Sequence, residues 1–430
     1  MSSSVLLPNT PEYKKAQRQY FKATKNRPAN IDQQWTPFRA AEKHFKARFP
    51  PPDLSSVLDL AAADDSRTQE IIDGHWKGSP TSIESVKVPL KGRSSHAYII
   101  PAIPGLVILP SFIPQEKQAS LVRWSLSRHA RKPNDTNLDV HYELPEEGLW
   151  NSWLKARTDP DKDILVQPKA SVSQPLQSFP VGPRQLVNNE PASLETFKTI
   201  SATPKPPAAP SPTAQPTPVS SLVHKMRWAN IGWFYHWGTK QYDFTKGKGI
   251  IDPELKSVCD DAVKSVNWER VHGTSSADWG PHGPDWQTWD QTYEPDAGIV
   301  NFYQEKDTLM AHVDQSEVCA TSPLVSISLG NTAVFLIGGL TRDTAPVPIL
   351  LRSGDIVIMS GPACRRAYHG IPRILEGSLP RHLRVEALEK EETKEEWKPY
   401  EEYLRTSRIN INVRQVFPRG FDPYAESSPS

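Results

Sequence analysis

The chain has 430 residues, which is enough for one large catalytic domain with attached segments or for two modest domains. Its 42 prolines outnumber its 22 glycines and only 37% of its residues are hydrophobic, so part of the chain should lie outside any core. The 50 Lys and Arg residues balance the 49 Asp and Glu residues, so the chain as a whole is not basic. Its net charge therefore gives no argument for a polyanionic partner.

The three cysteines argue against two common stabilising devices. Cys259, Cys319 and Cys364 are widely spaced and form no CxxC pair, so we expect neither a disulfide framework nor a structural zinc site. No apolar run is long enough to cross a membrane, and residues 1–10 lack the pattern of a signal peptide. We therefore expect a monomeric intracellular protein without membrane contact, in the nucleus or cytoplasm, with the mitochondrion as an alternative.

The first region, residues 1–92, is predicted to be basic and partly helical. Residues 1–49 contain ten Lys or Arg against three Asp or Glu. Between Pro11 and Arg48, apolar residues recur at steps of three and four, which predicts two short amphipathic helices. Their basic side chains form either a solvated surface, which we favour, or an arm that contacts nucleic acid.

Two segments with different character follow. Residues 93–158 should be folded, with a strand and turn in Ala97–Phe112 and a helix over Gln115–His129. Residues 159–221 contain thirteen prolines mixed with Ser, Thr, Ala and Gln. Such a composition cannot bury enough apolar area to offset its ordering entropy, so we predict a disordered, Pro-rich insert.

Residues 222–418 should form the catalytic core, and residues 419–430 a tail. Short apolar or alternating segments, separated by Gly-containing turns, predict a mainly β core built as an antiparallel sandwich or barrel, within an α+β chain. The predicted strands are Ile299–Tyr303, Leu324–Leu329, Ala333–Gly338, Ile349–Leu351, Asp355–Met359 and Arg408–Val416.

One set of residues in this core suits a metal ion. His312 and Asp314 are two residues apart, so on a strand both would point to the same face. Alone, such a pair is usually accidental. His369 could supply a third ligand, although a histidine satisfied by backbone contacts is the competing interpretation. Two histidines and one carboxylate leave open positions, an arrangement typical of non-haem iron(II) oxygenases.

The last predicted strand separates its side chains by type. Ile409, Ile411 and Val413 fall on one face, whereas Arg408 and Arg414 fall on the other, about 20 Å apart along the strand. The arginines are therefore too far apart to clamp one carboxylate together, but they can bracket a longer dianion or different groups, and arginine stays charged in a partly buried site.

The order of these motifs resembles the AlkB family of iron(II)- and 2-oxoglutarate-dependent dioxygenases, and most of all its AlkB homologue one branch. The resemblance is strong over residues 222–418 and gives residues 93–158 the place of the first part of the domain, on the substrate-recognition side. The motifs that carry it are Asn301-Phe302-Tyr303, His312-Val313-Asp314, Gly338-Gly339-Leu340, Ser353-Gly354-Asp355, His369-Gly370 and Arg408-Ile409-Asn410-Ile411-Asn412-Val413-Arg414.

The resemblance implies a double-stranded β-helix (jelly roll) with catalytic iron(II) held by His312, Asp314 and His369. It also implies that 2-oxoglutarate is contacted by Asn301, Tyr303, Arg408, Asn410 and Arg414. The implied activity is oxidative demethylation of a methylated base in nucleic acid, with tRNA favoured over DNA, coupled to conversion of 2-oxoglutarate to succinate and release of formaldehyde.

The substrate side is less defined by the sequence. Recognition of a base needs stacking surfaces, and we select Tyr235, Trp237 and Arg342 as candidate substrate contacts, although most such aromatic residues simply fill a core. Three alternative functions remain open: a non-catalytic nucleic-acid-binding module, a dioxygenase acting on protein, and a lyase acting at abasic sites.

Overall fold

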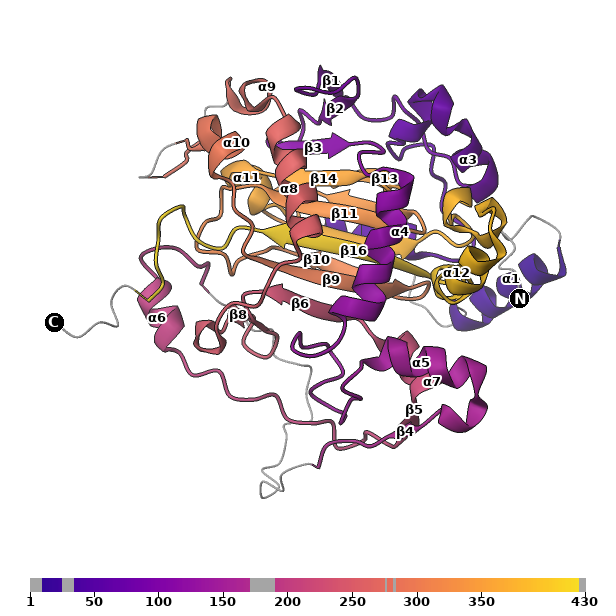
Figure 1. Ribbon diagram of the computed structural model, residues 1–430. Coiled ribbons are helices and arrows are strands. Elements are labelled where there is room, and N and C mark those ends of the chain that lie inside the picture. The colour runs from indigo at the N-terminus through magenta and orange to yellow at the C-terminus, as the bar shows by residue number, and fades with distance from the viewer. Residues whose placement is uncertain (1–9, 25–34, 171–189, 275–276, 281–283, 425–430) are drawn as a thin grey trace.

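Two antiparallel sheets form the centre of the protein in a computed structural model that describes residues 10–24, 35–170, 190–274, 277–280 and 284–424 (Figure 1). The larger sheet has the strand order β1-β2-β3-β14-β11-β16-β9-β6, and the smaller has the order β10-β15-β12-β13. The strands of the larger sheet are β1 (Val86–Pro89), β2 (His96–Ile99), β3 (Leu106–Leu109), β6 (Trp228–Gly232), β9 (Ala297–Gln304), β11 (Leu324–Gly330), β14 (Ile356–Met359) and β16 (Ser407–Arg414). Those of the smaller are β10 (Leu309–His312), β12 (Ala333–Ile337), β13 (Val347–Leu351) and β15 (His369–Ile374).

The two faces of the larger sheet have different surroundings, a helix-covered apolar core on one side and a cavity on the other. On β16, Ile409, Ile411 and Val413 are fully buried in a core shared with helices on the outer face of the sheet. Arg408 and Asn410 point to the opposite face, where they line a cavity between the two sheets. The period of two in this strand therefore fixes which residues can reach the interior of the β-sandwich.

Helices cover the sheets. In Figure 1, α4 (Gln115–Arg123) and α8 (Pro253–Ser265) run across the outer face of the larger sheet, and α2 (Pro37–Lys46) packs on β15, β10 and β12 of the smaller one. The other helices are α1 (Pro11–Thr24), α3 (Thr68–Gly74), α5 (Leu149–Thr158), α6 (Phe197–Ala202), α7 (Val219–Leu222), α9 (Trp268–His272), α10 (Trp289–Thr292), α11 (Gly361–Arg365) and α12 (Glu391–Leu404).

Most of the expected elements are present with shifts of a few residues. All six strands predicted after residue 298 occur, and α1 and α2 are the two expected N-terminal helices. Two expectations need correction. The strand expected in Ala97–Phe112 is a hairpin of β2 and β3, because the chain turns at residues 101–105. The helix expected over Gln115–His129 is α-helical only to Arg123 and continues as a wider π-helical turn over Trp124–His129.

The insert, residues 159–221, has more structure than its composition predicts. Leu165–Val166 (β4) pairs with Thr217–Pro218 (β5), and α6 and α7 lie within the same segment. Val166 and Val219, near the two ends of the insert, and Ala192, near its middle, are buried, so apolar residues of the insert join the domain core. The expectation of disorder is therefore wrong for these parts of the insert. Residues 171–189 lie outside the described residues.

Cys259, Cys319 and Cys364 are all buried and unpaired with one another, as expected. In the part of the chain that the structure describes, no helix combines the length and apolarity that a membrane span needs.

Candidate metal and 2-oxoglutarate site

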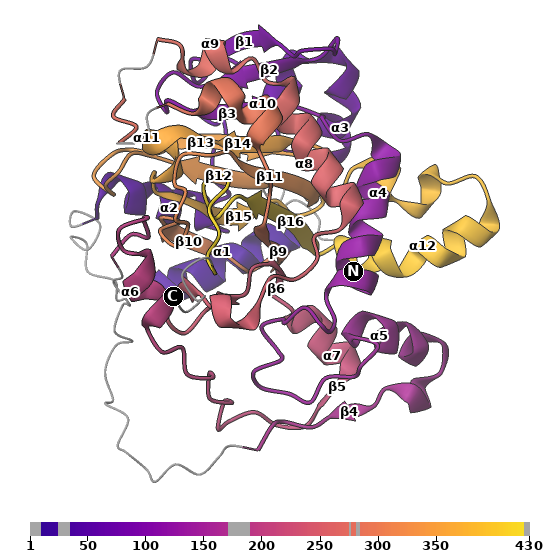
Figure 2. The ribbon, with the colours of Figure 1, turned by 60° about the vertical axis from the view of Figure 1, so that its left-hand side comes forward.

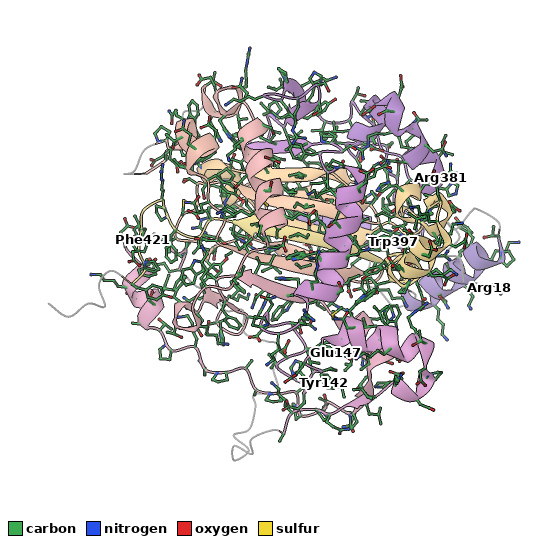
Figure 3. The ribbon with its side chains drawn as sticks, in the orientation of Figure 1. Arg18, Tyr142, Glu147, Arg381, Trp397 and Phe421 are labelled. Atoms are coloured by element: carbon green, nitrogen blue, oxygen red, sulfur yellow. The ribbon has the colours of Figure 1, made fainter. Side chains whose placement is uncertain are left out.

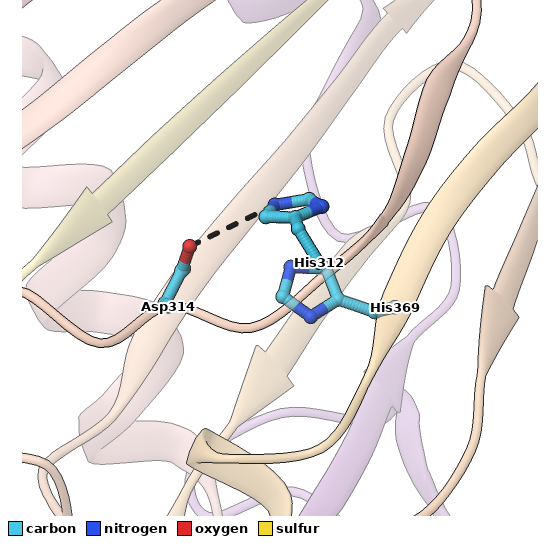
Figure 4. Close-up of side chains that lie close together, drawn as sticks. All are labelled: His312, Asp314 and His369. Carbon is cyan, nitrogen blue, oxygen red and sulfur yellow. Dashed lines mark ion pairs between the residues drawn. The ribbon is translucent and has the colours of Figure 1, made fainter. Parts of the chain in front are cut away.

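His312, Asp314 and His369 come together at one end of the space between the sheets (Figure 4). His312 is the last residue of β10, Asp314 follows in the adjoining loop, and His369 opens β15, which pairs with β10 so that the two histidines are directly opposite. One possible ligand atom from each residue lies within 4.8 Å of the others. Asp314 is in the loop rather than on the strand, so the expected same-face geometry does not explain the grouping. Pairing of β10 with β15 brings the two histidines together, and Arg414 of β16 holds Asp314 beside them.

Hydrogen bonds leave the same nitrogen of both histidines available. Nδ1 of His312 lies 3.0 Å from the carbonyl oxygen of Met310, and Nδ1 of His369 lies 3.0 Å from that of Ala367. A carbonyl oxygen can only accept, so each Nδ1 carries the hydrogen and each Nε2 presents a lone pair. Burial lowers the pKa of His369 to about 4, so this ring is neutral near pH 7, as a metal ligand must be.

The carboxylate of Asp314 is held by arginine. Nη1 of Arg414 lies 3.0 Å from Oδ2 of Asp314 and 2.8 Å from Oε1 of Glu317. Burial opposes ionisation of Asp314, but the charge of Arg414, assisted by the neighbouring histidines, keeps its pKa well below the ordinary value. Oδ1 of Asp314 lies 3.7 Å from Nε2 of His312. The carboxylate therefore has one oxygen bound to Arg414 and the other directed toward the histidines.

The five residues selected for 2-oxoglutarate all line one cavity together with the three candidate metal ligands. Strand register explains the grouping, since Tyr303 is directly opposite Arg408, and Asn301 is opposite Asn410, on the adjacent strands β9 and β16. Arg414 lies at the metal end of the cavity. The other polar and apolar lining residues include Ser326, Asn412, Leu309, Leu324, Phe335, Leu351, Val357, Met359 and Ile371.

Arg408 provides a test of whether this cavity suits a dicarboxylate. Its side chain is fully buried, and its hydrogen bonds go to neutral oxygens: the carbonyls of Asn331 and Leu351 and the hydroxyl of Ser328. Its Nε has no hydrogen-bond partner, and among the described residues no carboxylate lies within ion-pairing distance of it. Burial lowers its pKa to about 10. A buried guanidinium without an anion is costly, so the cavity fits a ligand that brings a carboxylate to Arg408.

Comparison with known proteins agrees with this geometry. Residues 184–414 match the 2OG-Fe(II) oxygenase superfamily. The chain is 30% identical over 404 residues to the DNA N(6)-methyladenine demethylase ALKBH1A of Arabidopsis thaliana, covering 90% of this chain and 99% of that protein. The chain belongs to the 2OG-Fe(II) oxygenase superfamily.

Two further relatives place the chain within the AlkB group of that superfamily. It is 26% identical to the human nucleic acid dioxygenase ALKBH1 over 85% of this chain and 79% of that protein. It is 28% identical to the tRNA demethylase abh1 of Schizosaccharomyces pombe over 89% of this chain and 96% of that protein. As a 2OG-Fe(II) oxygenase, the protein uses iron(II) and 2-oxoglutarate, and the His-Asp-His cluster and Arg408 are suited to hold them.

The three candidate substrate contacts lie outside the cavity lining of this oxygenase. Tyr235 belongs to a small hairpin of β7 (Tyr235–His236) and β8 (Gln241–Tyr242), and Trp237 lies in its turn, 40% exposed. The ring of Trp237 stacks on Trp228 with centroids 4.8 Å apart. Arg342 is exposed, and its Nη2 donates to the carbonyl of Ala311, beside His312.

Sequence reasoning assigned no role to three other charged residues near the metal cluster. Glu317 and Arg365 are almost fully buried, and Oε2 of Glu317 lies 3.8 Å from Nη2 of Arg365. Arg366 donates from Nη1 to the carbonyl of Asp314 at 2.7 Å. The only available signal was the proximity of Glu317 to Asp314 along the chain, which does not reveal that both carboxylates share Arg414.

Proposed function

We propose that this oxygenase oxidatively demethylates a methylated base in nucleic acid, with tRNA as the first substrate to test and DNA as the second. The cavity is the observation that carries the proposal, because it combines a His-Asp-His cluster with a buried arginine that lacks an anion. The match to ALKBH1 relatives over nearly the whole chain supports nucleic acid as the substrate class.

We propose that His312, Asp314 and His369 bind iron(II) and act as the catalytic centre. The metal and cosubstrate, when bound, supply the oxidising chemistry that removes the methyl carbon as formaldehyde and yields succinate. Arg414 orients Asp314 by occupying Oδ2, so that Oδ1 remains for the metal. The carbonyls that accept from the two histidine Nδ1–H groups fix ring orientation in the same way.

We propose that Arg408 binds the distal carboxylate of 2-oxoglutarate, for which a guanidinium fork is well suited. Tyr303 and Asn410 are beside it on the cavity wall and would help to orient the cosubstrate with Asn301. Apolar lining residues such as Leu351 and Phe335 exclude water from the carbon chain of the ketoacid. Because Arg408 and Arg414 are six residues apart on β16, Arg414 contacts Asp314 at the metal end of the cavity and Arg408 lies at the opposite end.

We propose that the stacked pair of Trp228 and Trp237, with Tyr235 beside it, contributes to holding the nucleic acid. The rings of Tyr235 and Trp237 meet edge to face at 5.0 Å. A partly exposed aromatic cluster of this kind offers a face on which a base can stack. Arg342 is exposed on the loop after β12 and is hydrogen-bonded to the carbonyl of Ala311, so it would contact the nucleic acid beside the candidate ligand His312.

The alternatives predict different behaviour. A non-catalytic binding module does not need His312, Asp314 and His369 grouped with an uncompensated Arg408 in one cavity, so this grouping favours an enzyme. A protein oxygenase could use the same iron site but would release no demethylated nucleoside. A lyase acting at abasic sites would cleave nucleic acid without iron or 2-oxoglutarate.

The deciding experiment incubates the purified protein with iron(II), 2-oxoglutarate and either cellular tRNA or DNA, followed by digestion and mass spectrometry of the nucleosides. We expect a methylated nucleoside to decrease while succinate and formaldehyde appear. His312→Ala, Asp314→Ala and His369→Ala should each abolish this loss. If the Asp314→Ala protein converts 2-oxoglutarate at the wild-type rate, the proposed metal site is wrong.

A further inference from the structure

The loop after β10 that carries Asp314, which we call the metal loop, is hydrogen-bonded to two other segments of the chain. The carbonyl of Gln315 accepts a hydrogen bond of 2.8 Å from the backbone N–H of Ala192, which belongs to the insert. The hydroxyl of Ser316 donates at 2.9 Å to the carbonyl of Lys240, in the hairpin that presents Trp237. The middle of the insert and the aromatic hairpin therefore both contact the residues that follow Asp314, the candidate metal ligand.

A third contact joins the insert to the hairpin directly. Nδ1 of His236 accepts a hydrogen bond of 3.1 Å from the backbone N–H of Thr239, so the ring nitrogen that carries a hydrogen is Nε2. Nε2 then donates to the carbonyl of Pro206 at 2.9 Å. The metal loop, the hairpin and the insert are thus connected in pairs, and a displacement of one segment alone breaks hydrogen bonds to the other two.

An apolar cluster fills the space among these segments. From the insert it contains Ala192, Leu194, Phe197 and Ile200, of which the last three recur at steps of three. The rest of the domain contributes Trp233, Tyr235, Tyr242, Phe244, Ala297, Val318, Val416, Phe417 and Phe421. Tyr235 and Tyr242 come from the hairpin and Val318 from the metal loop, so all three segments share one small core.

Phe197 is central to this cluster. Its ring centroid is 5.5 Å from Phe244, 5.5 Å from Phe417 and 5.2 Å from Phe421. Figures 1 and 3 show α6, which begins at Phe197, beside the C-terminal segment that carries Phe421, and Figure 2 shows the same neighbourhood from a second side. Truncating Phe197 would remove the largest apolar side chain that the insert contributes to the cluster.

The side chain of Arg366 also connects the metal loop with the insert. Its Nη1 donates to the carbonyl of Asp314 at 2.7 Å, and its Nη2 donates to the carbonyl of Ala192 at 3.2 Å. One guanidinium therefore holds the backbone of a candidate metal ligand and the backbone of the insert together. None of residues 190–206 lines the cavity that contains Arg408, so these contacts leave the cosubstrate pocket itself untouched.

We propose that residues 190–206 act as a strap that sets the position of the β7–β8 hairpin relative to the metal loop, and so determine how tightly the methylated nucleic acid binds. The proposal rests on the proposed function, because the hairpin is taken to contact the nucleic acid. The strap fixes the substrate side of the site, whereas Arg408 and its neighbours fix the cosubstrate side. Loosening the strap then weakens nucleic-acid binding without weakening 2-oxoglutarate binding.

The test compares Phe197→Ala with Phe197→Leu, which keeps apolar volume. A matched control is Phe112→Ala, which removes a buried ring from the core on the helix side of the larger sheet, away from the strap. Full-length proteins loaded with Mn(II) and 2-oxoglutarate are titrated into fluorescent tRNA and into a single-stranded DNA oligonucleotide containing N6-methyladenine, and binding is read by anisotropy. Affinity for 2-oxoglutarate and amide hydrogen exchange over residues 228–242 are measured on the same proteins.

We expect Phe197→Ala to weaken nucleic-acid affinity by roughly tenfold, to speed exchange in the hairpin, and to leave 2-oxoglutarate affinity within about twofold. Phe197→Leu should recover most of the affinity, and Phe112→Ala should lower thermal stability without this selective loss. Equal nucleic-acid affinity in Phe197→Ala and the wild type, or an equal loss in Phe112→Ala, would overturn the proposal. If the wild type binds neither nucleic acid, the proposed function fails; unchanged exchange in Phe197→Ala would separately refute the strap.

Discussion

Glu317 is a buried carboxylate whose position gives it influence over the metal site without direct contact with the metal. It is 1% exposed, it shares Nη1 of Arg414 with Asp314, and its Oε1 also accepts from the hydroxyl of Tyr242 at 3.4 Å. Arg365 lies 3.8 Å away on its other side. Glu317 therefore offsets buried positive charge that would otherwise act on Asp314 alone.

Glu317→Gln should lower the affinity of the protein for Mn(II) by roughly tenfold, since one negative charge near a divalent cation is lost while the shape is retained. The measurement is a titration followed by electron paramagnetic resonance without cosubstrate. Glu401→Gln is a matched control. Glu401 is also buried and paired with an arginine, Arg405, but it belongs to α12 and not to the metal cluster. If both variants lose thermal stability and neither loses Mn(II) affinity, Glu317 is a structural residue only.

The sequence revealed the residues of this site unevenly. Arg408, Asn410 and Arg414 could be selected because the period of two in one strand puts them on the same face, and the structure has them in one cavity. The sharing of Arg414 between Asp314 and Glu317 could not be predicted, since it depends on how the loop after β10 turns. Loop conformation follows from contacts with the insert and hairpin, which no local pattern in the sequence describes.

At the scale of elements, Asp296 joins three pieces of the larger sheet. Its Oδ1 accepts from the backbone N–H of Val416, its own N–H donates to the carbonyl of Arg414, and its carbonyl accepts from the N–H of Trp233. Asp296 thus connects the start of β9 with the end of β16 and with the chain after β6. Burial raises the pKa of this carboxyl to about 6.

A raised folded-state pKa means that the folded protein holds this proton more tightly than the unfolded chain. The contribution of Asp296 to stability is therefore present at low pH and is lost as pH rises through about 6, by at most about 3 kcal/mol. Asp296→Asn should remove this loss, so the difference in unfolding free energy between variant and wild type should change between pH 5 and 7 by roughly 1–2 kcal/mol. Urea unfolding at several pH values measures it, and parallel curves would contradict the assignment.

Secondary structure was predictable where the side-chain period was clear. The strands after residue 298 each have an apolar or alternating run bounded by turns, and their ends are marked by residues such as Gly330 and Gly354, both with positive φ. The insert was not predictable in this way. Its proline content suggested disorder, yet Phe197 and Leu194 pack on the domain because other segments provide a complementary apolar surface. Composition measures the average of a segment, whereas docking needs only a few well-placed side chains.

At the scale of the whole molecule, the interior has a charge distribution suited to bound ligands. Arg408 is buried at one end of the cavity with no carboxylate partner among the described residues, and the His-Asp-His cluster offers three possible ligands for a cation at the other end. The guanidinium of Arg408 is costly to bury without an anion, and a carboxylate bound beside it would offset this cost. Metal ion and dicarboxylate should therefore stabilise the fold by linkage as well as take part in turnover.

This linkage gives a measurement that does not depend on catalysis. At a hundredfold excess over its dissociation constant, a ligand that binds only the folded protein adds about 2.7 kcal/mol to the unfolding free energy. We expect Mn(II) and 2-oxoglutarate under anaerobic conditions to raise the melting temperature of the wild type in two increments. Arg408→Ala should retain the Mn(II) increment and lose most of the 2-oxoglutarate increment, because a charge-assisted contact to the distal carboxylate is removed.

Arg408→Lys separates charge from geometry in the same experiment. An ammonium restores the positive charge but not the planar fork, so only part of the 2-oxoglutarate increment should return. Succinate, which keeps two carboxylates but lacks the keto group, serves as a second probe of the distal contact. Should Arg408→Ala show the full wild-type increment with 2-oxoglutarate, β16 does not bind the cosubstrate, and the unpaired charge of Arg408 needs a different explanation.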